Sequence, residues 1–249
     1  ARLVEERPEW ATRCALEPAR PGQPRRLTLS MAEVGLGDAG LAEWCTWMDQ
    51  RLAAERAGGQ ARGRFKASSV DFSENQLTAA GVKTLCGLLE KHNVRCEVFR
   101  LTGNAMGNEG IRYVAKYLTC SGQAMAAELH ISRNARITGE GLKWLLGSLA
   151  LHPAYPVWSS ESDRYVPLWI VADLAKLRGE AGYQVLQGAC TSLSCSVCLG
   201  ERSGDVHCGP RRCVNVGCSD ELKHNCVAHL SKWEASDEAA PLPAPAPHA

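Results

Sequence analysis

A strand-like run that ends at an asparagine and leads into a helix-like run occurs three times in this chain. The copies are VDFSENQLTAAGVKTLCGLLEKH from Val70, VFRLTGNAMGNEGIRYVAKYL from Val98 and ELHISRNARITGEGLKWLLGSLALH from Glu128. Apolar residues alternate before each asparagine and recur every third or fourth position after it, so each copy predicts a strand followed by a helix. A repeat of about thirty residues predicts stacked units that share one continuous core.

The three copies align position by position, and two flanking stretches align less completely. A stretch from Leu27 carries Ala32 at the asparagine position, and a stretch from Pro167 carries Asp173 there. Such atypical outer units are expected, because an end unit faces solvent on one side. The aligned positions are Val70, Phe99 and Leu129, then Phe72, Leu101 and Ile131, then Asn75, Asn104 and Asn134, and finally Gly81, Gly110 and Gly141.

The central units resemble leucine-rich repeats of the ribonuclease-inhibitor-like type, in which a long helix follows each LxLxxNxL strand. The resemblance covers residues 27–190 and is closest over residues 66–152. It implies an α/β solenoid of about five units, with a parallel sheet on the concave face and helices on the convex face. It also implies a platform for binding other proteins, although the fold alone does not specify a function.

The residue types of the repeat have physical reasons. The asparagine stands where the chain leaves the sheet, so a buried amide there can satisfy backbone groups that lose their ladder partners. The glycines are expected to allow a tight entry into each helix. Unrelated strand–helix units in a doubly wound sheet are the alternative architecture, but the match through every element of the repeat favours the solenoid.

The chain divides into four predicted regions. Residues 1–26 form an N-terminal cap or linker, and residues 27–190 form the repeats. Residues 191–233 form a cysteine- and histidine-rich C-terminal cap, which we expect to cover the strand near 168–170 and its sheet edge. Residues 234–249 are rich in Pro and Ala and are expected to be disordered.

Twelve cysteines are present; Cys14, Cys96 and Cys120 are isolated, and the other nine are of two kinds. Cys45 and Cys86 occupy helix positions that hold Ala or Leu in other units, so they are predicted to be buried apolar side chains. A dense group of cysteines and histidines begins at the last residue of the repeats and continues through the cap: Cys190, Cys195, Cys198, Cys208, Cys213, Cys218, Cys226, His207, His224 and His229.

Three interpretations of the cap cysteines remain open at this stage. The first is a zinc site, because Cys195 and Cys198 have C-x-x-C spacing and later residues can complete a tetrahedron. Our candidate ligands are Cys195, Cys198, Cys213 and Cys218, and Cys208, His224 and Cys226 are further possibilities. The second interpretation is disulfides, against which the odd number of cysteines in the group argues. The third is a cap with reduced cysteines and no metal.

Composition and motifs predict a protein-binding, noncatalytic chain. The net charge of +1 gives no support for a nucleic-acid partner, and no apolar run is long enough to span a membrane. No phosphate loop, nucleophile elbow or metalloprotease helix is present. The absence of a signal-peptide pattern favours an intracellular, cytoplasmic location.

We expect the partner to bind side chains that point from the strands onto the concave face. Alternation along each strand selects these residues, which mix both charges with one aromatic ring, as suits a protein surface. A structural subunit of a larger assembly is the alternative function. The predicted contact residues are Asp71, Ser73, Glu74, Arg100, Thr102, His130, Ser132, Arg133 and Trp169.

Overall fold

The structure is a computed structural model that describes residues 7–18, 23–57, 65–121, 124–152, 154–159, 164–172, 196–198, 208, 213 and 226–231. Its elements in chain order are α1 Pro8–Ala11, β1 Cys14–Leu16, β2 Arg25–Ser30, α2 Asp38–Ala57, β3 Phe65–Asp71, α3 Ala79–Lys91, β4 Val94–Arg100, α4 Gly107–Leu118, β5 Glu128–His130, α5 Gly139–Ala150, β6 Val157–Ser159, β7 Arg164–Val166, β8 Leu168–Val171, β9 Ser196–Cys198 and β10 Cys226–Ser231.

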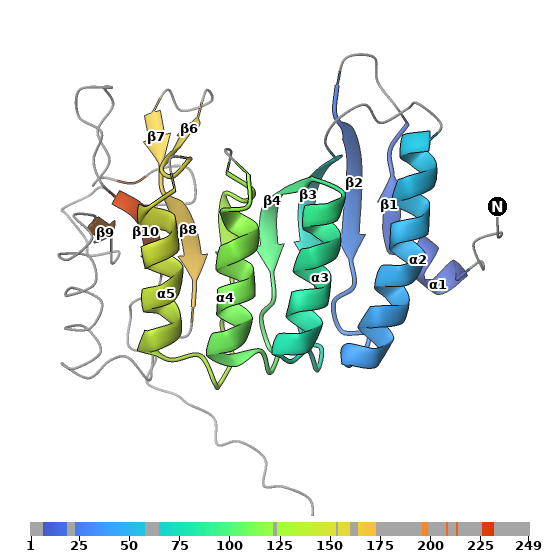
Figure 1. Cartoon of the computed structure of the whole chain (residues 1–249), viewed down its shortest axis with the longest axis horizontal. Helices are drawn as coiled ribbons and strands as arrows, with labels where there is room; N and C mark the ends of the chain where they lie inside the picture. Colours follow the sequence, from blue (N-terminus) through green and yellow to red (C-terminus); the bar gives the residue numbers. More distant parts are fainter. Residues whose placement is uncertain are drawn as a thin grey trace, which may run out of the picture.

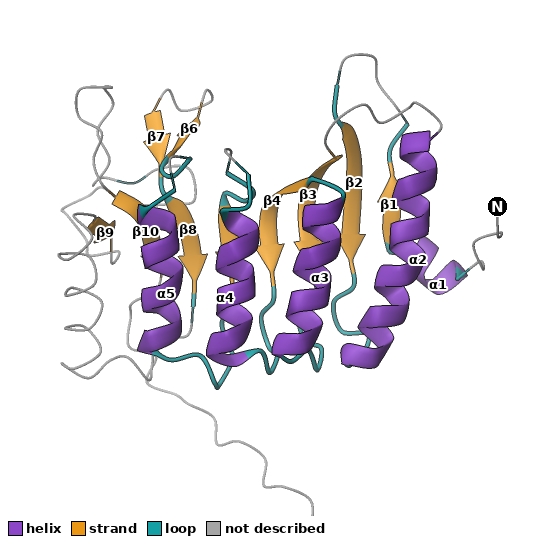
Figure 2. Ribbon diagram, viewed as in Figure 1, coloured by secondary structure: helices purple, strands orange, loops and turns teal. Residues whose placement is uncertain are grey.

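A mostly parallel sheet with helices on one face forms the molecule, so the α/β class is confirmed. Eight described strands form this sheet in the order β1-β2-β3-β4-β5-β8-β10-β9, and within it only β1 runs antiparallel to its neighbour. The strands β6 and β7 form a separate antiparallel pair. Helices α2 to α5 stand side by side in front of this sheet (Figures 1 and 2). None of the helices in the described part of the chain has the length and apolarity that crossing a membrane requires.

The apolar positions of the repeat form the core between sheet and helices, as predicted. Val70 and Phe72 of the first central copy are fully buried, and so are the helix residues Val82, Leu85 and Leu89. The corresponding residues of the next two units are equally buried. Alternation along the strands therefore points one set of side chains toward α2–α5 and the other set away from them. We call the side of the sheet opposite these helices the distal face.

Each repeat asparagine joins its own unit to the preceding one. Asn104 lies buried, and its Nδ2 donates to the carbonyl oxygen of Leu101 in its own unit and to that of Phe72 in the preceding unit, at 3.1 and 2.9 Å. Its Oδ1 accepts a hydrogen bond from the Leu77 backbone N–H at 3.0 Å. Asn75 and Asn134 bond in the same pattern. The predicted role of the asparagines is confirmed.

The alignment of the two flanking units is wrong by two residues. In the sheet Leu29 pairs with Val70, so Val34 rather than Ala32 is the counterpart of Asn75. At the other end, Ile170 rather than Leu168 pairs with Leu129, so Asp173 is not the counterpart of Asn134. Asp173 itself lies outside the described residues. Val34 needs no amide, because its unit has no preceding parallel strand to serve.

Gly81 and Gly141 allow close packing between neighbouring helices, which differs from the expectation that they ease entry into a helix, whereas Gly110 lies against Met106 at the start of its own helix. A Cβ on Gly81 would lie 2.3 Å from Oδ1 of Asp38, and a Cβ on Gly141 would lie 2.5 Å from Oδ1 of Asn108. These oxygens accept hydrogen bonds from the backbone N–H of Thr78 and Thr138, which directly precede α3 and α5. A polar residue on one helix thus caps the next helix along the sheet.

The predicted caps at both ends of the repeats contribute strands to the sheet. In the N-terminal segment, β1 pairs with β2, and the buried Cys14 joins the core. In the C-terminal segment, β10 pairs with β8 and places Leu230 opposite Ile170, which confirms that this segment covers the edge of β8. The apolar residues expected to cover this edge are Leu193, Val197, Leu199, Val227 and Leu230. Val227 and Leu230 lie in the core and Val197 packs against it, whereas Leu193 and Leu199 lie outside the described residues.

Replacing Asn104 with Ala should lower the free energy of unfolding by about 1–3 kcal/mol, because buried backbone groups of two units lose their partners. Chemical denaturation monitored by circular dichroism measures this change. The matched control is Gln76→Ala, which deletes an exposed amide next to Asn75 and should shift stability by less than about 0.5 kcal/mol. Equal denaturation midpoints for the two variants would contradict the bridging role.

Candidate metal centre

The last strands of the sheet align three side chains on the distal face. Trp169 on β8 pairs with His229 on β10, and His229 pairs with Cys198 on β9. Paired residues of neighbouring parallel strands point to the same side of a sheet. Leu168 and Ile170 point toward the helices and are fully buried, so Trp169, His229 and Cys198 point the other way.

Cys208 and Cys213 join Cys198 and His229 in one compact cluster. The three Sγ atoms and a ring nitrogen of His229 all lie within 4.8 Å of one another. Sγ of Cys198 is 3.9 Å from Sγ of Cys208, and Sγ of Cys213 is 3.8 Å from Nδ1 of His229. Cys198, Cys213 and His229 are at most 2% exposed, whereas Cys208 is half-buried.

Two of the six separations in the cluster lie close to the edges of a tetrahedron around a metal ion, and all six are at most 4.8 Å. With metal–sulfur bonds of about 2.3 Å and metal–nitrogen bonds of about 2.0 Å, the edges of such a tetrahedron measure about 3.5 to 3.8 Å. The observed 3.9 and 3.8 Å require little movement to reach these values. The Cys198–Cys208 distance is about twice the length of a disulfide bond, so these two sulfurs are not bonded to each other. The cluster can therefore hold a metal ion.

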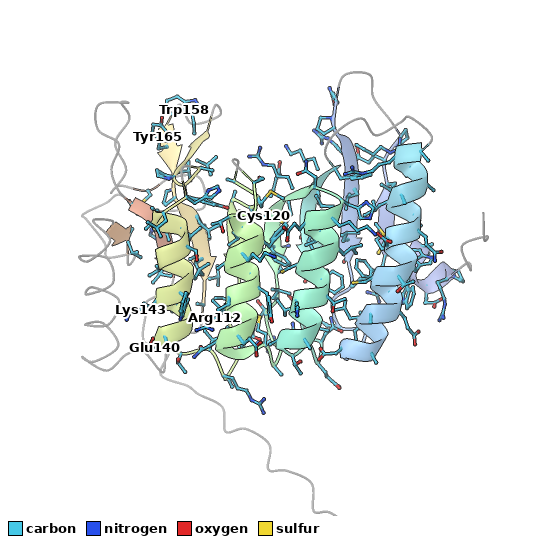
Figure 3. All side chains as sticks on the ribbon, viewed as in Figure 1. Arg112, Cys120, Glu140, Lys143, Trp158 and Tyr165 are labelled. Carbon is cyan, nitrogen blue, oxygen red and sulfur yellow. The ribbon has the colours of Figure 1, made fainter. Side chains whose placement is uncertain are left out.

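Aromatic rings surround the cluster on the distal face. The Trp169 ring stacks on the His229 ring, with the centroids 4.1 Å apart and an interplanar angle of 2°. Tyr165 on β7 packs against the buried group formed by Cys198, Cys213 and Cys226, and its ring meets Trp158 of β6 edge to face. Figure 3 shows Trp158 and Tyr165 together on the β6–β7 hairpin. The Cys198 and Cys213 side chains are at most 2% exposed, and such burial favours retention of a bound metal.

The structure brings together part of the predicted ligand set. Cys198 and Cys213 belong to the cluster, and Cys195 and Cys218 lie outside the described residues. Cys226, which sequence reasoning had considered, donates from its Sγ to the carbonyl oxygen of Ala228 and is not one of the four clustered residues.

His229 is the cluster residue that the sequence analysis did not propose as a ligand. It lies in the run CVAHLS, which forms β10 and whose apolar residues enter the core. The available signal was that His229 is a polar residue within an otherwise apolar strand and close to many cysteines. A buried histidine in that position requires a polar partner.

Cysteines outside the cluster have a different character. Burial raises the pKa of Cys45 and of Cys96 to about 12, so both remain neutral thiols at physiological pH. Burial raises the pKa of Cys86 as well. The prediction that Cys45 and Cys86 serve as apolar core residues is confirmed.

The predicted contact residues lie along the strands at the distal face. Asp71, Arg100 and His130 pair across β3, β4 and β5 and form one row. Arg133 pairs with Glu74 just beyond the strands. Ser73, Thr102 and Ser132 are half-buried, and Trp169 is half-buried beside the metal cluster. The predicted contact surface and the candidate metal centre therefore adjoin each other.

Comparisons with known proteins add no family to this description. No protein-family model matches the sequence, and no curated protein matches it. The function is therefore argued from the geometry of the chain itself.

Protein purified under reducing conditions should carry about one tightly bound transition metal ion per chain, since one tetrahedral set of ligands is present. Elemental analysis measures the stoichiometry and identifies the metal. Cys208→Ser should lower the metal content at least tenfold.

The matched control for this loss is Cys120→Ser. Cys120 is half-buried like Cys208 but lies just beyond the end of α4, away from the cluster (Figure 3). This variant should keep its metal. Metal-free wild-type protein, or equal metal content in both variants, would contradict the assignment.

Proposed function

We propose that this chain is a noncatalytic protein-interaction module, a leucine-rich-repeat solenoid whose distal face is the concave, partner-binding face. The observation that carries the proposal is the row of side chains that consecutive strands present there. Asp71, Arg100 and His130 occupy equivalent positions on three adjacent strands. Each repeat thus contributes its own variable residue to one continuous surface, which suits recognition of an extended partner.

The chemistry of this surface favours a protein partner over a nucleic acid. Acidic and basic side chains alternate on it, and Lys66 pairs with Glu97 at 2.7 Å across two strands. Glu128 and His130 lie 3.2 Å apart on β5. An exposed ion pair such as Lys66–Glu97 contributes only about 0–1 kcal/mol, so a partner can replace it with its own charges at small cost. Trp169 adds a half-buried aromatic ring beside the charged rows, a residue type common at interface hot spots.

We further propose that the metal is Zn²⁺ and that its role is structural. Three thiolates and one imidazole suit a borderline-soft ion that prefers tetrahedral geometry. Four protein ligands fill that coordination and leave no position for a substrate, which agrees with a noncatalytic role. The ion would connect β9 and β10 to the segments that carry Cys208 and Cys213. It would hold the C-terminal end of the sheet together without forming part of a reaction.

A structural subunit of a larger assembly is the second candidate. Two large apolar side chains are exposed at α5: Trp144 within the helix is 52% exposed, and Leu151 directly after it is 80% exposed. Arg112 lies over the Trp144 ring at 4.3 Å, and Figure 3 shows Arg112 on α4 beside α5. A second surface of this kind is expected of a subunit that contacts neighbours on both sides.

The combined change Arg100→Glu and Arg133→Glu should reduce partner capture at least tenfold, because two positive charges on the proposed surface become negative. Affinity-tagged wild-type and variant proteins are compared by quantitative mass spectrometry of the captured proteins. Circular dichroism should show an unchanged fold, since Arg100 is half-buried and Arg133 is exposed.

The matched control reverses two exposed lysines on the helices, Lys116 of α4 and Lys143 of α5. This double variant has the same change in net charge and should capture partners as the wild type does. Loss of capture in the control, with capture retained by the arginine variant, would place the interface on the helices and favour the assembly-subunit function.

A further inference from the structure

The metal cluster and the proposed binding surface share one pair of stacked side chains. Nδ1 of His229 faces Sγ of Cys213 at 3.8 Å, within the group that can hold the metal. The face of the same imidazole lies parallel to the indole of Trp169, with 4.1 Å between the centroids. His229 is 1% exposed, whereas Trp169 is half-buried. One ring therefore connects the cluster with the distal face.

Trp169 is also the link between this pair and the charged rows. In the sheet it lies opposite Glu128 on β5, and Glu128 contacts His130 at 3.2 Å. The cross-strand order on the distal face is thus Glu128, Trp169, His229 and Cys198. The indole is the last half-exposed side chain of this row before the buried cluster begins.

We propose that metal binding at the cluster fixes the orientation of Trp169 and thereby sets the shape of the adjoining end of the distal face. The inference rests on the proposed zinc site and adds a control of the binding surface to it. Metal coordination through a ring nitrogen fixes both the position and the plane of an imidazole. A fixed imidazole offers the indole one stacking partner in one orientation, and aromatic pairs of this kind stabilise a defined geometry.

Loss of the metal removes the constraint at its source. Only packing and hydrogen bonds then hold the ring of His229. The thiols of Cys198, Cys208 and Cys213 are no longer held at fixed distances from it, and each can move on its own. The stacked position of Trp169 becomes one of several conformations. A partner that requires the ordered indole would bind the metal-loaded protein more tightly than the metal-free protein. The ratio of the two affinities equals the ratio of the fractions of protein in which the indole is ordered.

Fluorine NMR of protein labelled with 5-fluorotryptophan tests the inference on the full chain. The seven tryptophans give separate reporters, and Trp169→Phe assigns the Trp169 resonance. Removal of zinc with a chelator should shift and broaden this resonance, and addition of zinc should restore it. Trp44 is fully buried under β3 and serves as the internal reference, so its resonance should stay unchanged.

Two substitutions of His229 separate metal binding from stacking. His229→Cys supplies a fourth thiolate, so zinc remains bound, but the aromatic ring is gone. The Trp169 resonance of this zinc-loaded variant should resemble that of zinc-free wild type. His229→Phe keeps an aromatic ring without a ligand atom, so the response of Trp169 to zinc should be lost.

The possible results distinguish this inference from the zinc site on which it rests. Wild-type protein without bound zinc overturns both. Zinc bound at about one ion per chain, with a Trp169 resonance that does not respond to its removal, overturns the inference alone. A response in His229→Phe, or a wild-type resonance in zinc-loaded His229→Cys, also overturns it, because the coupling would not pass through the imidazole. If His229→Cys does not fold, the wild-type titration decides the result.

Discussion

The architecture depends on a side-chain amide that serves two neighbouring strand–helix units at once. Asn75, Asn104 and Asn134 each accept a hydrogen bond from the preceding unit and donate to carbonyl groups of both units. These backbone groups lie where the strands end and ladder bonding stops, so leaving them unpaired in the core would be costly. The bridge fixes the distance between adjacent turns of the chain. At this distance the neighbouring helices are so close that a side chain would not fit at the positions of Gly81 and Gly141.

The C-terminal end of the sheet is built on a different principle. From β2 to β8 the strands of the main sheet lie side by side in chain order, but β10 then lies between β8 and β9. Leu230 and Ala228 on one side of β10 extend the core, while His229 on the other side enters the cluster with Cys198, Cys208 and Cys213. One strand thus carries apolar residues toward the helices and a metal-ligand type of residue toward the distal face. The alternation that builds the repeats also positions this cluster.

Sequence reasoning predicted the repeating elements well because their periodicity is strong and local. The buried residues of the three central units and the role of the asparagines follow from it. The contribution of the C-terminal segment was expected for another reason, because the last repeat strand would otherwise leave an open sheet edge. The errors concern long-range geometry. The register of the outer units differs by two residues, since Val34 and not Ala32 aligns with Asn75. The place of His229 in the cluster was missed because the other members come from separate segments, and no spacing rule connects it with Cys208 and Cys213. The C-x-x-C spacing identified Cys198 but not the residues that surround it.

The order of the last strands also governs when the sheet can be completed. β9 precedes β10 in the chain but lies outside it, so β9 cannot pair in the sheet until the chain has been made as far as β10. The units from β2 to β5 have no such requirement, because each strand pairs with the one made before it. During synthesis the units from β2 to β5 can therefore associate one after another as they emerge, while the edge of β8 stays open until β10 has been made. The order of the strands therefore requires that this edge is completed after the units from β2 to β5 have paired, and this requirement does not depend on the stability of the folded protein.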